Sequence, residues 1–98
     1  MNPITLKLYV TGRTSRSDQA IENVKKIYNA LGENANLIII DVLDDPDTAE
    51  KDKILATPTL IREDVDKYRR VIGDMSDIQR LLSWLDLEAY SDRISKEV

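Results

Sequence analysis

The chain contains no cysteine and no histidine among its 98 residues. Without a thiolate it cannot carry out dithiol–disulfide exchange. The Ser-His and Cys-His pairs that activate many nucleophiles are excluded as well. Zinc and most transition metals lose their preferred ligands, which leaves only carboxylates. We therefore predict no catalytic residue, no cofactor and no metal site, and a protein that is not an enzyme.

Long apolar runs and clusters of basic residues are also missing. The longest apolar run, residues 37–40, is far too short to cross a bilayer, and the first residues lack the pattern of a signal peptide. The net charge is −4, and the acidic excess is the same in both halves of the chain. Nucleic-acid binding needs clustered Lys and Arg. These features predict a cytoplasmic protein with no membrane segment and no nucleic-acid partner.

The first half of the chain has the pattern of a strand, a helix and a second strand. Apolar residues alternate over residues 4–10, which is the period of a strand. Helical spacing predicts a helix over residues 17–31, with Ser17 as its N-cap and Gly32 at its end. The continuous apolar run that follows, residues 36–42, predicts a strand covered on both faces. The two strands should then be parallel, with a right-handed crossover.

Two stretches have a functional alternative. The hydroxyl-rich loop 11–17 precedes a helix, so its amides could bind an anion, although it lacks the glycines and the lysine of a P-loop. Four aspartates lie close together after the second strand: Asp41, Asp44, Asp45 and Asp47. They could bind a divalent cation, but their spacing does not match an EF-hand. Helix capping by Asp45 before Pro46 explains this stretch better.

The second half of the chain is organised around the segment 51–61, which becomes apolar at Ile54 and contains Pro58. Because proline has no N–H, this segment should enter an edge strand or an irregular strand. A polar loop at residues 63–67 and a strand at residues 68–72 complete a hairpin.

A last helix should begin at Ser76, where Gln79 completes a capping box. Its buried stripe consists of Ile78, Leu81, Leu82 and Leu85. The full order is β-α-β-α-β-β-α, which predicts a single α/β domain of thioredoxin-like fold with a mixed sheet. We place this domain at residues 1–90 and a charged, flexible C-terminal tail at residues 91–98.

Several motifs resemble those of the KaiB family of circadian-clock proteins. They are Leu6-Lys-Leu-Tyr-Val-Thr-Gly12, Ile40-Asp-Val-Leu43, Asp52-Lys-Ile-Leu-Ala-Thr-Pro-Thr-Leu60, Arg69-Arg-Val-Ile-Gly-Asp74 and Leu85-Asp-Leu87. The Ala-Thr-Pro-Thr turn also resembles the cis-proline turn of thioredoxin-like domains, which implies a cis bond before Pro58. A receptor domain fused to some clock histidine kinases is related to this family.

The resemblance implies a binding module without chemistry of its own. KaiB-like proteins dock on the N-terminal ATPase ring of the hexameric protein KaiC, and in cyanobacteria the complex sequesters KaiA. They also switch between a tetramer of altered secondary structure and a thioredoxin-like monomer that binds KaiC. A homo-oligomer, either a dimer or a tetramer, is therefore another expectation for this chain.

The resemblance also assigns site residues. Lys53, Arg69 and Arg70 match basic family positions and are implied to lie in or near the KaiC contact, although solvated surface charge explains them equally well. Gln19 and Ile38 stand where cyanobacterial members have an arginine and a lysine. Loss of two basic groups weakens complementarity with an acidic partner. These departures argue against KaiA sequestration more than against KaiC binding.

The fold-switch region should contain Trp84 and Asp86. The cyanobacterial pattern has a glycine where this chain has Trp84, and glycine costs about 0.5–1 kcal/mol in a helix relative to alanine. We therefore predict that the thioredoxin-like state dominates, with Trp84 buried against Leu81 or Leu85. In the alternative, Trp84 packs at a subunit contact and the other fold dominates.

Three functions compete at this stage. The first is a regulator that binds a KaiC-like ATPase in a circadian or timing system. The second is a stress-response or signalling adaptor of the same fold without a clock role. The third is a glutathione- or peptide-handling enzyme, supported only by the Thr57-Pro58-Thr59 turn, which in such folds presents backbone groups to an extended ligand.

Overall fold

The computed structural model describes residues 3–95. Its elements, in chain order, are β1 (Ile4–Val10), α1 (Ser15–Leu31), the 3₁₀ turn η1 (Gly32–Asn34), β2 (Ala35–Asp41), α2 (Pro46–Lys51), β3 (Thr59–Glu63), β4 (Tyr68–Ile72), α3 (Ile78–Trp84), the 3₁₀ turn η2 (Glu88–Tyr90) and α4 (Ser91–Ser95). The predicted β-α-β-α-β-β-α order is confirmed through α3.

The four strands form one mixed sheet in the order β2-β1-β3-β4. β1 and β2 are parallel, as expected for strands joined by a helix, whereas β3 is antiparallel to both β1 and β4. Lys7 in the middle of β1 therefore lies between Ile38 of β2 and Ile61 of β3. β2 and β4 are the two edges of the sheet.

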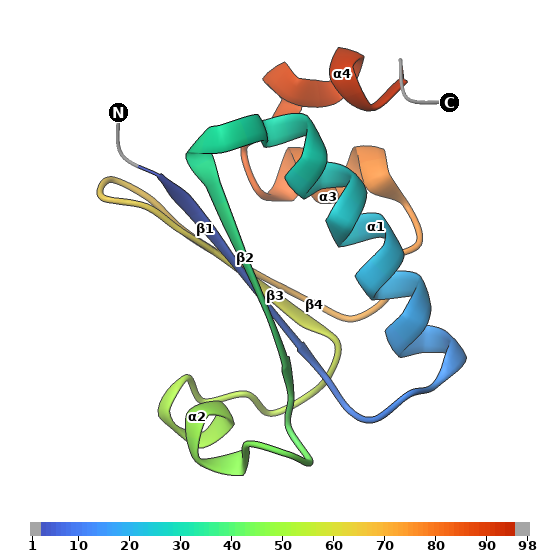
Figure 1. The fold of residues 1–98 in the computed structure, drawn as a ribbon, viewed down its shortest axis with the longest axis vertical. Coiled ribbons are helices and arrows are strands. Elements are labelled where there is room, and N and C mark those ends of the chain that lie inside the picture. The colour runs from blue at the N-terminus through green and yellow to red at the C-terminus, as the bar shows by residue number, and fades with distance from the viewer. Residues whose placement is uncertain (1–2, 96–98) are drawn as a thin grey trace.

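Three helices cover one face of the sheet. Figure 1 shows α1, α3 and α4 on the same side of the strands. The core between them includes Leu6, Leu8, Leu60, Leu81, Leu82 and Leu85, each at most 1% exposed. This confirms the predicted buried stripe of α3 at Leu81, Leu82 and Leu85, whereas Ile78 is only partly buried. Asn23 of α1 adds a polar tie, because its Nδ2 donates to the carbonyl oxygen of Met75 at 2.6 Å.

Among residues 3–95, α2 alone covers the opposite face, and it lies near one end of the strands (Figure 1). A small second cluster forms there from Tyr9, Ala49 and Ile61. The expectation that β2 is covered on both faces is wrong. β2 is an edge strand, and its Ile38 and Ile39 are 45% and 39% exposed. An apolar run alone does not distinguish a central strand from an exposed edge.

Two helices begin at other residues than the sequence predicted. α1 is capped by Thr14, whose Oγ1 accepts a hydrogen bond from the amide of Ser17, so Ser17 already lies inside the helix. α3 is capped by Asp77 and not by Ser76. The Asp74 side chain accepts a hydrogen bond from the Ser76 amide at 3.0 Å and holds that residue in the preceding turn. Asp45 caps α2 as predicted.

The predicted tail departs from the structure over the residues that are described. Residues 91–95 form α4, and Ile94 packs into the main core at 7% exposure. Arg93 donates to the carbonyl oxygen of Ala30 at 3.0 Å, and its guanidinium lies 5.5 Å from the ring centroid of Tyr90. The ordered unit thus continues past residue 90. The rest of the predicted tail, residues 96–98, lies outside the described residues.

Candidate binding surface

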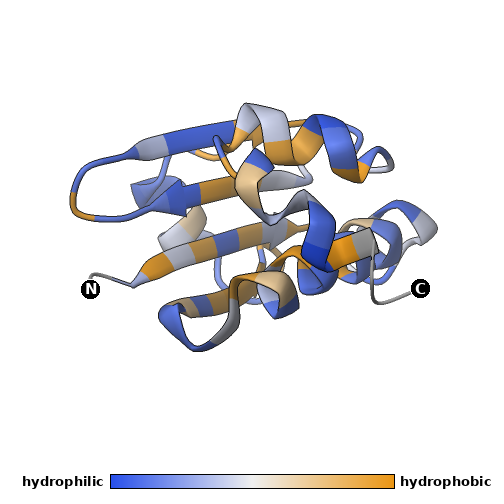
Figure 2. Ribbon diagram, turned by 90° about the horizontal axis from the view of Figure 1, so that it is seen from above, coloured by the Kyte–Doolittle hydropathy of each residue, from blue (hydrophilic) through white to orange (hydrophobic). Residues whose placement is uncertain are grey.

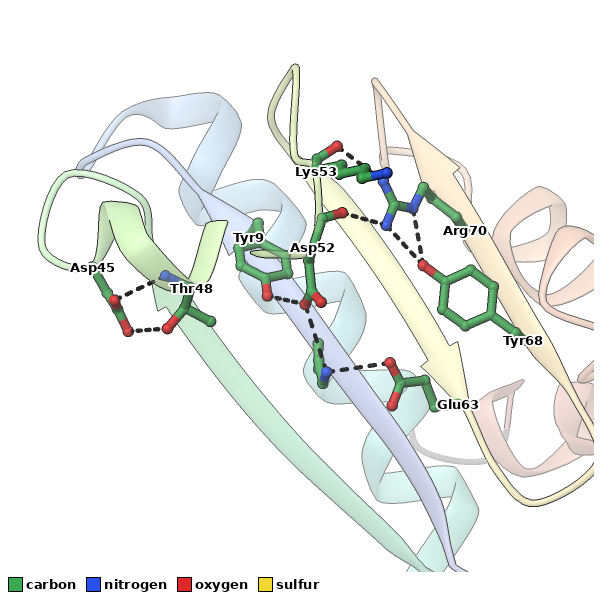
Figure 3. Close-up of polar contacts among 9 residues, drawn as sticks. Tyr9, Asp45, Thr48, Asp52, Lys53, Glu63, Tyr68 and Arg70 are labelled. Atoms are coloured by element: carbon green, nitrogen blue, oxygen red, sulfur yellow. Dashed lines mark hydrogen bonds and ion pairs between the residues drawn. The ribbon is translucent and has the colours of Figure 1, made fainter. Parts of the chain in front are cut away.

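The end of α2 is fixed to the sheet by a charged network around Asp52. The Asp52 carboxylate accepts a hydrogen bond from the phenol of Tyr9 and lies 3.5 Å from Nζ of Lys7. Lys7 also donates to Oε1 of Glu63 at 3.2 Å. Figure 3 shows Tyr9, Asp52 and Glu63 lying near one another beside α2. The network joins α2, β1 and β3.

The shifted pKa values of Lys7 and Tyr9 keep both side chains protonated. Burial and the hydrogen bond to Asp52 both raise the pKa of the Tyr9 phenol. Partial burial works to lower the pKa of Lys7, but the hydrogen bond to Glu63 and the charge of Asp52 outweigh it, so the pKa is raised. Tyr9 therefore remains a donor and Lys7 remains a cation near neutral pH.

Arg70 of β4 holds the turn that follows α2. Its guanidinium donates to the carbonyl oxygens of Asp52 and Lys53, at 2.6 and 3.2 Å, and to the hydroxyl of Tyr68 at 2.7 Å (Figure 3). Lys53 has a φ of 54°, which is a left-handed conformation that non-glycine residues rarely adopt. The bonds from Arg70 to this turn support that conformation.

The structure brings together two of the three basic residues that the family resemblance singled out. Lys53 and Arg70 are neighbours through the hydrogen bond just described. Arg69 lies on the other face of β4, because successive side chains of a strand alternate, and it stands exposed opposite Arg62 of β3. A flat partner that covers Lys53 and Arg70 would therefore not cover Arg69 as well.

The predicted cis proline lies in the turn that leads from α2 into β3. The bond between Thr57 and Pro58 is cis, as expected. The Pro58 ring is buried, and its carbonyl oxygen accepts a hydrogen bond from the Gly73 amide at 3.0 Å. The Thr57 hydroxyl lies 2.6 Å from that of Thr11, so the turn contacts the end of β1. The contacts of Thr57 and Pro58 thus attach the turn between α2 and β3 to the ends of β1 and β4.

An apolar hollow of about 600 Å³ adjoins the basic pair. It is lined by Val42, Pro46, Ala49, Glu50, Lys53, Ile54 and Leu55. Leu55 is 95% exposed, and Leu43 in the preceding loop is 68% exposed. Apolar side chains this exposed beside a hollow are typical of a protein-binding surface. We call the hollow, together with Leu43 and Arg70, the α2 surface.

The two alternatives from the sequence find no support in the geometry. In the loop before α1, the Gly12 amide donates to the Asp41 carboxylate at 3.1 Å, and the Ser17 amide donates to Thr14. These amides are therefore engaged within the chain and do not face an anion. Asp45 is occupied as a helix cap. Within residues 3–95, no group of three or more acidic side chains is arranged to hold a metal ion.

The predicted fold-switch region is helical and then turns sharply. Trp84, the last residue of α3, is 49% exposed, so the expectation that it is buried against Leu81 or Leu85 is wrong; its ring lies beside the guanidinium of Arg80. Asp86 follows with a φ of 59° and pairs with Lys67 in the β3–β4 loop. The region is thus tied to the hairpin.

Sequence reasoning missed the network around Asp52. The alternation in β1 places Lys7 and Tyr9 on the face opposite Leu6 and Leu8, and it says nothing of what covers that face. Tyr9 is nevertheless fully buried, because α2 covers this part of the sheet. An aromatic residue at such a position is the one available signal that something packs over it.

A family model described as the KaiB domain matches residues 7–87. The circadian clock protein KaiB3 of Synechocystis is 48% identical over 88 residues, which cover 89% of this chain and 86% of that protein. The circadian clock oscillator protein KaiB of a Synechococcus strain is 47% identical, covering 95% of this chain and 87% of that protein.

Solved structures agree on the fold. The N-terminal domain of SasA from Synechococcus elongatus superposes with a TM-score of 0.68 at 27% identity, over 88% of this chain and 86% of that chain. Mitochondrial thioredoxin 3 from Saccharomyces cerevisiae has a TM-score of 0.71 at 16% identity, over 88% and 79% of the two chains. The fold is therefore thioredoxin-like, as predicted. Among the residues that the structure describes, no helix is both long and apolar enough to cross a membrane.

Proposed function

Because this chain belongs to the KaiB family of circadian clock proteins, we propose that it binds a KaiC-type hexameric ATPase and regulates it in a timing system. KaiB proteins are regulatory clock components and not enzymes. The absence of cysteine agrees with this role, because the fold carries no dithiol site. We place this activity in the cytoplasm.

The α2 surface is the observation that carries the proposal. It combines two basic side chains, Lys53 and Arg70, with an apolar hollow and two strongly exposed leucines. Apolar groups that lose water on docking supply affinity, and charges at the rim supply orientation and association rate. The matching partner surface would present an apolar side chain flanked by carboxylates.

The thioredoxin-like state is the one we propose to bind. The Asp52 network and Arg70 fix the turn that carries Lys53 only when β1, β3 and β4 are arranged as they are in this state. The SasA N-terminal domain has the same fold at 27% identity, which supports the thioredoxin-like state as a stable form of related sequences.

We do not extend the proposal to KaiA. Gln19 and Ile38 replace the basic residues of cyanobacterial members. Ile38 lies at the free edge of β2 and is 45% exposed, so the lost charge is at the surface. A surface without that charge is less complementary to an acidic partner.

Direct binding to a purified KaiC-type hexamer, measured by biolayer interferometry at low and high salt, tests the proposal. Lys53→Glu should weaken binding at least about tenfold, and added salt should narrow the difference. The matched control is Arg69→Glu, which makes the same charge reversal on the other face of β4 and should change binding much less. No binding by the wild-type protein would favour an adaptor role without a clock. Equal losses in both variants would contradict the α2 surface as the contact.

A further inference from the structure

Arg70 of β4 uses most of its hydrogen-bond donors within the chain. β4 begins with hydrophilic residues, which are typical of a solvated strand edge (Figure 2). Arg70 is nevertheless half-buried. Its guanidinium donates to the carbonyl oxygens of Asp52 and Lys53, and both its Nε and its Nη2 donate to the hydroxyl of Tyr68, at 3.1 and 2.7 Å. These four hydrogen bonds engage most of the N–H groups of a guanidinium.

Lys53 occupies a strained position at the end of α2. The Lys53 amide donates to the Glu50 carbonyl oxygen at 3.1 Å, and the Ile54 amide donates to that of Ala49 at 2.9 Å. This pair of bonds is the Schellman motif, which places one residue after the helix at positive φ. Glycine is the usual residue there, because it has no side chain to clash, but here the residue is Lys53 with a φ of 54°. The turn is therefore less stable by itself than a turn with glycine.

Arg70 supplies the missing support from a distant strand. The last carbonyl groups of a helix lack partners within the helix, and a cation near them interacts favourably with the helix dipole. The two carbonyl groups that Arg70 binds are of this kind, since Asp52 is the C-cap of α2 and Lys53 follows it. β4 brings Arg70 there by pairing with β3, where Arg70 faces Ile61, and Ile61 packs with Ala49 of α2.

We propose that Arg70 is a positioning residue, which acts on the partner through Lys53 and does not contact the partner itself. This role rests on the proposed function, in which both residues belong to the α2 surface, and it separates what each of them does. Lys53 is exposed and lines the apolar hollow, so its ammonium group is the one placed to meet a carboxylate of the ATPase. Figure 3 shows the Arg70 guanidinium turned toward the backbone of Asp52 and Lys53 and toward the ring of Tyr68.

A positioning role makes Arg70 different from a simple surface charge. Lysine at this position would keep the positive charge, but its single ammonium group cannot reproduce the planar fork that reaches two carbonyl oxygens and the Tyr68 hydroxyl together. Arg70→Lys should therefore weaken binding nearly as much as Arg70→Met does. If Arg70 instead met a carboxylate of the partner through its charge, Arg70→Lys would keep most of the affinity.

A double-mutant cycle on binding to a purified KaiC-type hexamer, measured by biolayer interferometry, tests this role. Arg70→Met, Arg70→Lys and Lys53→Met should each weaken binding about fivefold or more. The double variant with both methionines should bind no more than about twofold more weakly than Lys53→Met alone, because Arg70 then has no ammonium group left to position. The matched control is Arg69→Met, which removes a charge from the other face of β4 and should change the affinity less than about twofold.

Nuclear magnetic resonance of the free protein gives a second readout, which does not depend on the partner. In Arg70→Met, the coupling constant between the amide and α protons of Lys53 should leave the value of a left-handed residue. The Ile54 amide hydrogen should also exchange faster, because its bond to Ala49 is part of the same turn. Resonances of α1 should keep their wild-type positions, and circular dichroism confirms that each variant is folded.

Several outcomes overturn the proposal. Losses of affinity that add in the double variant would do so, because Arg70 would then act independently of Lys53. So would an Arg70→Lys variant that binds like the wild type, or an Arg70→Met protein in which the Lys53 turn is unchanged. These three outcomes leave the proposed function standing, since the wild-type protein still binds. Absence of wild-type binding overturns the proposed function and the positioning role with it.

Discussion

The guanidinium of Arg62 donates to the carbonyl oxygens of Leu85 and Asp86, at 2.6 and 3.0 Å, and so joins β3 to the end of α3. Arg62 is 6% exposed, and its charge is balanced by Asp64 at 2.9 Å. The last carbonyl groups of a helix have no partner within the helix. A cation near them also interacts favourably with the negative end of the helix dipole. This one side chain therefore holds the hairpin and the predicted fold-switch region together.

Replacing Arg62 by methionine should destabilise the protein by about 2–4 kcal/mol, because a side chain of similar size leaves the buried carbonyl group of Leu85 and the partly buried one of Asp86 without this donor. Urea denaturation followed by circular dichroism measures the change. Arg69→Met is the matched control: the exposed Arg69 faces Arg62 across the β3–β4 ladder, and its loss should cost no more than about 0.5 kcal/mol. Similar losses in both variants would show that the buried hydrogen bonds contribute little.

Removing the hydroxyl of Tyr9 tests the attachment of α2. Tyr9→Phe keeps the buried ring and deletes only the hydrogen bond to Asp52, so the free energy of unfolding should fall by about 1 kcal/mol. Amide hydrogen exchange should become faster in residues 46–53 before it changes in α1. Tyr68→Phe removes a hydroxyl from a half-exposed ring and should have a smaller effect. Uniform acceleration over the whole chain would contradict a local role.

The pH dependence of stability should include a contribution from Asp64. Its partial burial works to raise the pKa, but hydrogen bonds from Arg62 and from the amides of Asp66 and Lys67 outweigh this and lower the pKa below the ordinary 3.8. A carboxyl whose pKa is lowered by folding stabilises the folded state above its unfolded pKa. That contribution is lost as the pH falls through the lower, folded value.

Asp64→Asn should therefore be less stable than the wild type near neutral pH, and the two should converge as the pH falls below about 3.8. Thermal unfolding at a series of pH values measures the difference. A constant gap between the two proteins at all pH values would mean that the charge of Asp64 does not contribute.

Local patterns in the sequence predicted most of the fold. The alternation in β1 and the helical spacing of α1 are set by residues close in the chain, and the structure has both elements. The predictions failed where the burial of a residue depends on elements distant in the sequence. Tyr9 is buried because α2 covers it, and Ile38 is exposed because β2 is an edge of the four-stranded sheet. Neither the burial of Tyr9 nor the exposure of Ile38 can be predicted from the residues next to them in the sequence.

The candidate site was predicted in part for the same reason. Family motifs identified Lys53, Arg70 and Pro58, and the structure places all three around the turn after α2. The motif Arg69-Arg70 could not show that its two residues serve opposite faces, because that depends on the pairing of β4 with β3. Asp52 appeared in a motif without a role, since its partner Tyr9 lies 43 residues away.

The last prediction concerns Trp84, which stands where the cyanobacterial pattern has glycine. The side chain ends α3 and lies against Arg80, with 5.7 Å between the guanidinium and the ring centroid. Trp84→Gly should remove about 0.5–1 kcal/mol of cation–π attraction and add a helix penalty below about 1 kcal/mol. A loss of about 1–1.5 kcal/mol would lower the ratio of the thioredoxin-like state to any competing fold roughly tenfold.

Nuclear magnetic resonance of the Trp84→Gly protein should then show a second set of signals with strand-type shifts in residues 78–84. Trp84→Ala is the control, because it loses the attraction to Arg80 but keeps helix propensity, and it should shift the populations less than the glycine variant. Arg62→Met should act in the same direction, since it frees the carbonyl groups of Leu85 and Asp86 from β3. If both variants only unfold, with no second folded species, the thioredoxin-like state has no close competitor in this chain. Trp84 would then act only by stabilising the end of α3.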